Sequence, residues 1–145
     1  MGIKYTVFIP NATLVVGSDV VSIISAANRS VELTEVTAVG RGATSIPYSL
    51  RFARTPAGTT PTVPTTPFPA DIDSPASVST TATVWAVQPA MGANDGVGMG
   101  GNQLGGMARW LARGDERMRA RNGGVLSIRA QTTGSADVTV IYEDI

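Results

Sequence analysis

Alternation of apolar and polar residues dominates this chain, and helical spacing is scarce. The clearest case is residues 46–53, where Ile46, Tyr48, Leu50 and Phe52 alternate with Pro47, Ser49, Arg51 and Ala53. This pattern predicts a half-buried antiparallel strand with its arginine on the solvent side. Because proline cannot donate to a strand ladder, Pro47 indicates a strand start or an edge strand.

The same period predicts strands along most of the chain. We expect them at residues 3–9, 19–25, 31–39, 77–87, 116–121, 125–130 and 138–142, with Pro10 and Asn11 closing the first. Within 31–39 the apolar phase slips, which a β-bulge near Glu35 explains. The Asn122-Gly123-Gly124 sequence predicts a tight hairpin turn. Residues 107–113 fit either one helical turn or a short strand.

Residues 54–76 interrupt this pattern with a proline-rich segment. Six of the nine prolines lie there, which excludes a helix or a central strand. The proline spacing predicts an extended, polyproline-like arm. Irregular loops of this length are often functional. The interpretation we favour is that Pro61, Pro64, Pro67 and Phe68 contact a neighbouring subunit. The alternative is an ordered surface loop without a role.

Residues 91–107 form a second interruption, with seven glycines and three methionines. Glycine loses the most backbone entropy on ordering, so we expect a long irregular loop that a partner orders. Gly96, Gly98 and Gly101 match G-x-G-x-x-G. A dinucleotide site also needs a preceding strand, a following helix and a later acidic residue, and this context is missing.

Together these segments predict an all-β fold. The expected architecture is an antiparallel β-sandwich, jelly-roll-like, with eight or nine short strands and two long irregular loops. A chain of 145 residues is one domain by default. We therefore expect a single domain over 1–145, carrying the Pro-rich arm 54–76 and the Gly/Met-rich loop 91–107.

Composition narrows the chemistry. The chain has no histidine and no cysteine, and its only lysine is Lys4. It therefore lacks the usual nucleophile–base pairs and the imidazole and thiolate ligands of transition metals. We expect no enzyme, no catalytic residue, no metal and no cofactor. Asp71 and Asp73 suggest calcium binding or glycoside hydrolysis, but Pro75 interrupts the spacing and no third acid follows nearby.

Positive charge concentrates between residues 109 and 121. Arg109, Arg113, Arg117, Arg119 and Arg121 lie there, beside Trp110. Arginine and tryptophan are enriched at protein–protein hot spots, which favours an interface built from Arg109, Trp110, Arg117 and Arg119. A solvated face and a nucleic-acid site are the alternatives. The formal net charge of zero argues against nucleic acid as a partner.

Several stretches carry a family resemblance in their order and spacing. They are Tyr5-Thr6-Val7-Phe8, Val31-Glu32-Leu33-Thr34-Glu35-Val36, Leu50-Arg51-Phe52 before the arm, Arg109-Trp110 before the hairpin ending Leu126-Ser127-Ile128-Arg129, and Val140-Ile141-Tyr142-Glu143-Asp144. This pattern resembles the small β-sandwich structural proteins of tailed bacteriophage virions, of the capsid decoration (cement) type. Residues 91–107 depart from it.

The resemblance implies a non-enzymatic virion protein that binds and stabilises the major capsid lattice. Its location would be the capsid exterior after synthesis in the host cytoplasm, and its partners the major capsid protein and itself, as a homotrimer. A tail, neck or baseplate module and a carbohydrate-binding jelly roll are the alternatives. No apolar run is long enough for a membrane helix, so we expect no membrane partner.

Overall fold

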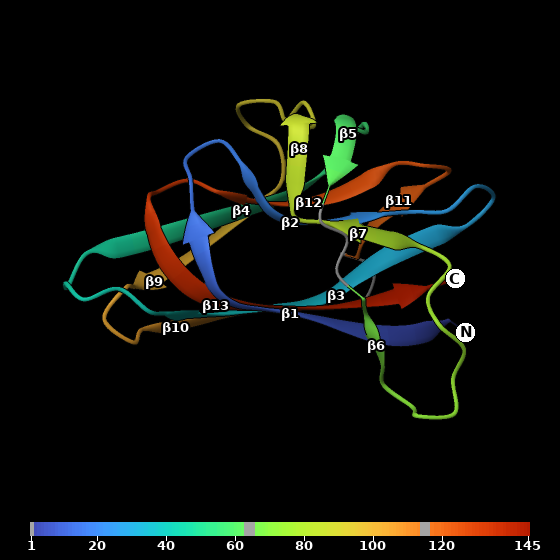
Figure 1. The fold of residues 1–145 in the computed structure, drawn as a ribbon, viewed down its shortest axis with the longest axis horizontal. Coiled ribbons are helices and arrows are strands. Elements are labelled where there is room, and N and C mark those ends of the chain that lie inside the picture. The colour runs from blue at the N-terminus through green and yellow to red at the C-terminus, as the bar shows by residue number, and fades with distance from the viewer. Residues whose placement is uncertain (1, 63–65, 114–116) are drawn as a thin grey trace.

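Three antiparallel sheets make up the fold (Figure 1). The computed structural model describes residues 2–62, 66–113 and 117–145, and in these ranges the chain forms thirteen strands and no helix. The predicted all-β, antiparallel sandwich is confirmed. The strand number exceeds the expected eight or nine, partly because the segments 54–76 and 91–107 contribute strands of their own.

Sheet A has six strands, in the order β10-β3-β13-β1-β6, with β11 also paired to β3. Its members are β1 (Ile3–Leu14), β3 (Ser30–Gly40), β6 (Phe68–Pro69), β10 (Met107–Leu111), β11 (Met118–Arg121) and β13 (Gly134–Asp144). β10 and β11 pair with different halves of β3, so they follow one another along the same edge. Residues 107–111 are therefore a strand rather than a helical turn.

Sheet B has five strands, in the order β7-β2-β12-β4-β9. Its members are β2 (Asp19–Ile24), β4 (Pro47–Thr55), β7 (Thr80–Ala82), β9 (Val97–Asn102) and β12 (Val125–Ala130). Sheet C consists of β5 (Thr59–Thr62) and β8 (Val84–Val87). It stands on the side of sheet B that faces away from sheet A (Figure 1).

The main core fills the space between sheets A and B. Tyr5 stacks on Tyr142 with ring centroids 5.6 Å apart, and Phe52 meets Trp110 edge-on at 4.9 Å. In β4, Tyr48 joins Phe52 in the core, as the alternation predicts, with Pro47 as first residue of the strand. Ile46 instead precedes the strand and is exposed.

β-Bulges set which side chains enter the core. Ile141 pairs with Glu35 and the next residue, Tyr142, pairs with Leu33, so β3 has one extra residue at the predicted position. A second irregularity, between Ile9 and Ala12, holds Asn11 at φ 47°. Because a bulge bends a strand without ending it, β1 runs to residue 14 rather than stopping at Pro10.

The glycine-rich segment differs most from its prediction. Residues 97–102 form β9, which pairs with β4 along its length. A Cβ at Gly100 would lie 2.6 Å from the carbonyl oxygen of Tyr48, and one at Gly101 would lie 2.9 Å from the Tyr48 hydroxyl. These glycines therefore permit close packing of β9 over Tyr48, which a composition-based interpretation cannot distinguish from a loop.

The turn at residues 121–124 also has a different role from the expected one. Asn122 and Gly123 adopt φ values of 52° and 82°, and the Gly124 amide donates to the Arg121 carbonyl at 2.9 Å. The tight turn is therefore present. However, the strands that it joins belong to different sheets, since β11 pairs with β3 and β12 pairs with β2 and β4. The turn connects the two layers and closes no hairpin.

Two glycines with positive φ offer a matched test of close packing. Gly96 has φ +86° and a Cβ there would overlap the Phe52 carbonyl oxygen, whereas Gly105 has φ +78° and nothing within 4 Å. Gly105→Ala should cost about 1–2 kcal/mol of unfolding free energy from backbone strain alone. Gly96→Ala should cost clearly more in urea unfolding. Equal losses would contradict the role of close approach.

Candidate functional site

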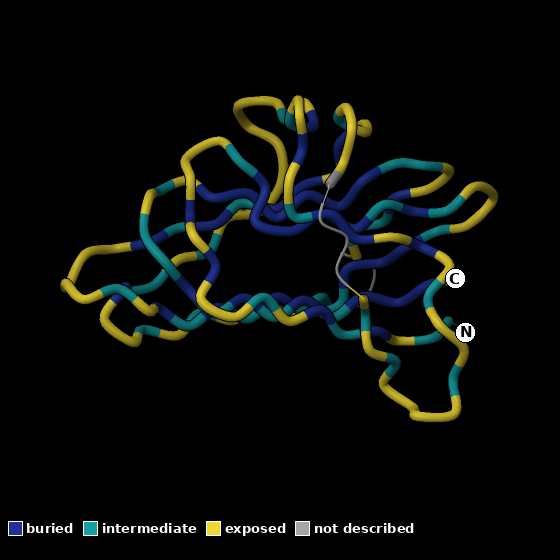
Figure 2. Tube along the Cα trace, viewed as in Figure 1, coloured by how far each residue is buried: buried dark blue, intermediate teal, exposed yellow. Residues whose placement is uncertain are grey.

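The two outer faces of the sandwich differ in what covers them. In sheet B, β2 and β12 are almost wholly buried next to sheet C, whereas the central strands of sheet A alternate between buried and intermediate residues (Figure 2). No described strand covers the outer face of sheet A. Each face carries a cluster of charged side chains, and their surroundings decide which cluster is accessible.

A buried polar cluster lies between sheets B and C. Arg129 pairs with Asp19 through Nε and Oδ1 at 2.8 Å, the Ser22 hydroxyl donates to Asp19 Oδ2 at 2.6 Å, and the Trp85 indole N–H donates to the Ser22 hydroxyl at 2.9 Å. A bulge at Val20 makes this possible, since β12 residues Ile128 and Arg129 pair with Val21 and Asp19. The bulge thereby brings Asp19 to the side of Arg129.

This cluster has the character of a structural network. Arg129 also donates through Nη2 to the Pro89 carbonyl at 2.5 Å, and the Asp19 amide donates to the Gln88 side chain at 2.9 Å. The Ser22 hydroxyl both donates to Asp19 and accepts from Trp85, so it is fixed in a structural hydrogen-bond network. Next to it, Ala82, Trp85 and Val125 form a second small core with Ile24. The cluster therefore attaches sheet C and its flanking loop to sheet B.

The outer face of sheet A is ordered in rows, because directly paired residues of neighbouring strands share a face. One row comprises Leu111, Glu35, Ile141, Thr6 and Phe68; a second comprises Arg109, Thr37, Thr139 and Phe8; a third comprises Arg119, Glu32, Glu143 and Lys4. The face therefore carries glutamates on its central strands, arginines beside Leu111 along the edge formed by β10 and β11, and Phe8 and Phe68 toward the other edge. We call this surface the outer face below.

Ion pairs within the chain neutralise much of that charge. Arg109 Nε contacts Glu35 Oε1 at 2.7 Å, and Arg119 contacts Glu32. Arg117 Nη1 lies 3.1 Å from Glu32 Oε2. The arginine side chains remain 57 %, 38 % and 51 % exposed for Arg109, Arg119 and Arg117. Since a guanidinium has five N–H donors, each keeps donors free for a partner.

The Arg109–Glu35 pair also changes proton affinities. The hydrogen bond from Arg109 lowers the pKa of Glu35 below its usual value, more than partial burial raises it. The same contact raises the pKa of Arg109. Both partners therefore stay charged over the neutral range, and the pair presents a nearly neutral surface.

Exposed apolar side chains flank these charges. Phe8 is 53 % exposed and Phe68 is 76 % exposed, and Met107 and Leu111 are exposed at the opposite edge. After β6, the segment of residues 70–76 projects beyond sheet A (Figure 1). Ile72 in this segment is 93 % exposed. Large apolar groups gathered on one uncovered side are typical of interaction surfaces.

The structure brings four predicted interface residues to this one face: Phe68, Arg109, Arg117 and Arg119. Trp110 is not among them. Consecutive strand residues point to opposite faces, so Trp110 lies inward, half-buried against Phe52. The prediction that Trp110 shares one surface with Arg109 is therefore corrected.

The prolines that were predicted to contact a neighbouring subunit do not lie together on one surface. Pro61 lies in β5 of sheet C, paired with Trp85, and is exposed on the other side of the sandwich. Pro67 precedes β6 and is half-buried, and Pro64 lies outside the described residues. The arm expected over 54–76 is thus divided between sheet C and the edge of sheet A.

Several residues of the outer face escape a composition-based search. Glu32 and Glu35 accept from the arginines, and Phe8, Ile141 and Ile72 supply apolar surface. A signal for two of them does exist, since Phe8 and Ile141 occupy the polar phase of their strands. An apolar residue in that phase indicates a surface that contacts something other than water.

Comparison of the chain with protein-family models, with curated proteins and with solved structures finds no match. Among the described residues, no group of three or more histidine, cysteine or acidic side chains is placed to hold a metal ion. The same residues contain no helix of the length and apolarity that a membrane crossing requires.

Removing Arg109 should raise the pKa of Glu35. A carboxyl whose pKa is lowered in the folded state stabilises the fold above its unfolded pKa, and this stabilisation is lost as pH falls through the lowered value. Arg109→Gln should therefore move the Glu35 titration upward in carboxyl-detected NMR. Arg41→Gln is the control, since Arg41 lowers the pKa of Asp137 instead. An unchanged Glu35 titration in Arg109→Gln would contradict the contact.

Breaking the buried ion pair should strongly destabilise the fold. Arg129→Met leaves the Asp19 carboxylate buried without its cation, at an expected cost of about 3–5 kcal/mol. The double variant Asp19→Leu/Arg129→Met should lose less than the sum of the two single variants, because it removes both charges. Urea unfolding of all four proteins measures the coupling, and strict additivity would exclude it.

Proposed function

We propose that this chain is a non-catalytic structural protein that docks onto a protein lattice through the outer face, as a head decoration protein of a tailed-phage virion. The observation that carries the proposal is the asymmetry of the sandwich. Sheet C and the loop that follows it cover β2 and β12 of sheet B, while sheet A presents paired charges and exposed Phe8 and Phe68 with no described strand over them. The virion setting is supported by the resemblance in sequence pattern.

The character of the outer face favours a protein partner over plain solvation. Only 15 % of the residues are charged, against about 25 % in typical soluble domains. The arginines of the face already hold carboxylates of the same chain, so a partner covers charges that are largely compensated. The apolar edges then supply the surface burial that drives association.

Individually weak contacts suffice in this role. A lattice binds many copies, and a homotrimer engages three sites at once, so effective affinity exceeds that of one contact. The projecting segment 70–76 extends past sheet A and offers Ile72 to a neighbouring subunit. In this proposal the major capsid protein supplies the opposing surface.

The positions of the tryptophans disfavour the carbohydrate-binding alternative. Sugar sites need exposed aromatic platforms, yet Trp85 is buried between sheet C, to which it belongs, and sheet B, and Trp110 packs edge-on against Phe52. A tail or baseplate module would use the same docking mechanism. Imaging of the assembled particle separates the two, because a decoration protein covers the head and a tail module forms a ring.

The outer face can be tested with single charged substitutions. Phe8→Glu and Ile72→Glu change exposed side chains and should leave stability within about 0.5 kcal/mol, so thermal unfolding should be unaltered. Each should weaken binding to particles lacking this chain by about tenfold or more, as expected for loss of an interface anchor. Co-sedimentation with such particles measures occupancy.

The matched control is Val16→Glu, which alters a residue 58 % exposed in the turn between β1 and β2. It should bind as the parent does. If both outer-face variants bind normally, the outer face is not the docking surface. If the chain is found only in the tail, the decoration role is overturned and the tail module takes its place.

A further inference from the structure

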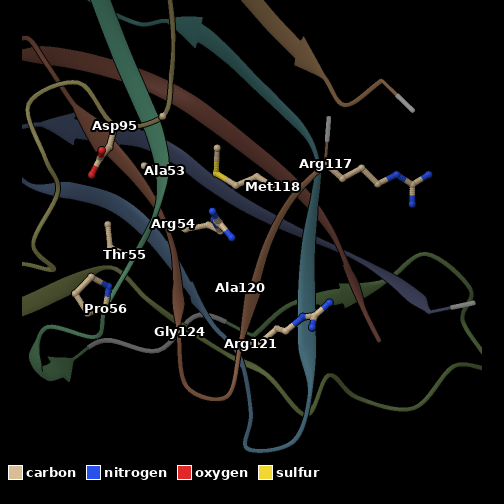
Figure 3. Close-up of a pocket in the computed structure, with 11 residues that line it drawn as sticks. Ala53, Arg54, Thr55, Pro56, Asp95, Arg117, Met118, Ala120, Arg121 and Gly124 are labelled. Atoms are coloured by element: carbon tan, nitrogen blue, oxygen red, sulfur yellow. The ribbon is translucent and has the colours of Figure 1, made fainter. Parts of the chain in front are cut away.

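A groove opens along one side of the sandwich, where β11 of sheet A faces the end of β4 in sheet B (Figure 3). Further along the same side, β9 and β10 contact each other across the two layers. The groove has a volume of about 790 Å³, within the size range of ligand-binding sites. Its lining includes Arg54, Thr55, Asp95, Met118, Ala120 and Arg121.

Arg54 is the unusual member of this lining. It follows Leu50 and Phe52 in the phase of β4 that enters the core, and it pairs with Leu126, which is fully buried. At Arg54 the layers have separated, so this inward position is exposed to solvent. Figure 3 shows its side chain extending from β4 toward β11. A cation therefore stands where the alternation would place an apolar side chain.

The groove carries more positive charge than it neutralises. Within the described part of the chain, neither Arg54 nor Arg121 has an ion pair, and neither side chain forms a hydrogen bond. Arg117, on the β11 side, already contacts Glu32 and Glu143. Asp95, the one acid among the described residues of the lining, accepts from the Gly92 amide at 2.8 Å. Arg54, in the inward phase of β4, and Arg121, in the outward phase of β11 at the rim of the groove, thus keep their guanidinium groups available for anions.

The remaining surface of the groove suits a peptide. Met118 and Ala120 belong to the inward phase of β11 and pack against the main core, which gives the groove an apolar floor. Among the described strands β11 pairs only with β3, so its other edge offers unpaired backbone groups. An extended peptide can bind such an edge through main-chain hydrogen bonds.

Nucleic acid fits this groove less well. No aromatic side chain lines it, so bases would have nothing on which to stack. The formal net charge of the chain is zero, so it exerts no general attraction on polyanions. Carboxylates on the two faces of an extended segment can meet the inward Arg54 and the outward Arg121, since arginine binds carboxylates with strong, charge-assisted hydrogen bonds.

We propose that this groove binds an acidic, extended segment of a partner protein. The segment lies along the free edge of β11, places one carboxylate inward against Arg54 and one outward against Arg121, and sets small apolar side chains over Met118 and Ala120. The site borders the outer face, with Arg117 at the boundary, and does not depend on the docking function proposed above.

The test uses the full chain and a fluorescein-labelled peptide that repeats Glu-Glu-Val-Val, so that each face of the extended peptide carries carboxylates. A peptide that repeats Gln-Gln-Val-Val is its uncharged match. Fluorescence anisotropy should show that the acidic peptide binds. The uncharged peptide should bind at least about tenfold more weakly than the acidic one. Arg54→Gln and Arg121→Gln should each weaken binding of the acidic peptide about tenfold. Neither residue has an ion pair to lose, so both variants should fold normally.

Arg41→Gln is the control of equal charge change, since Arg41 pairs with Asp137 and does not line the groove. It should bind as the parent does. No binding of the acidic peptide, equal binding of both peptides, or equal losses in all three variants would overturn the proposal. So would displacement of the peptide by inorganic phosphate or an oligothymidine at equal or lower concentration, which would identify a phosphate site.

Discussion

The buried ion pair between Asp19 and Arg129 is the constraint on which the asymmetry of this fold depends. Burying two charges is unfavourable unless each finds its partner and its hydrogen bonds. Here the bulge at Val20 aligns Asp19 with Arg129, and Ser22, Gln88 and the Pro89 carbonyl supply the remaining partners. With this network complete, the polar side of sheet B can be covered by sheet C. Sheet A is then the layer whose polar side stays open.

The open and covered faces use the same residue types for different purposes. On sheet A, the pairs of Arg109 with Glu35 and of Arg119 with Glu32 lie at the surface, where they contribute little to stability but keep arginine donors accessible. Phe8 and Phe68 add apolar area that a monomer would not need. Along the side of the sandwich, where the layers part, Arg54 occupies an inward position and forms no ion pair with any described residue. The proposed docking and peptide sites both follow from what the layers leave uncovered.

Much of the strand pattern could be predicted from the sequence. The strand around residues 46–53, the bulge near Glu35 and the tight turn at Asn122-Gly123 are all present. Strand β9 could not be predicted, because its glycines are there for close approach to Tyr48, a residue about fifty positions earlier in the chain. The candidate interface was found in part. The density of arginines indicates Arg109 and Arg119, whereas Trp110 lies on the other side of β10 because consecutive strand residues point to opposite faces.

The sequence by itself determined which side chains share a face, because a strand places every second residue on the same side. Only the tertiary structure decided what each polar face meets. Ser127 and Arg129 in β12 alternate with apolar residues just as Thr37 and Glu35 do along β3, yet the first pair is buried and the second is partly exposed. The physical reason is that alternation is a local property of one strand. Coverage depends on where sheet C docks, and that is set by contacts between residues far apart in the chain.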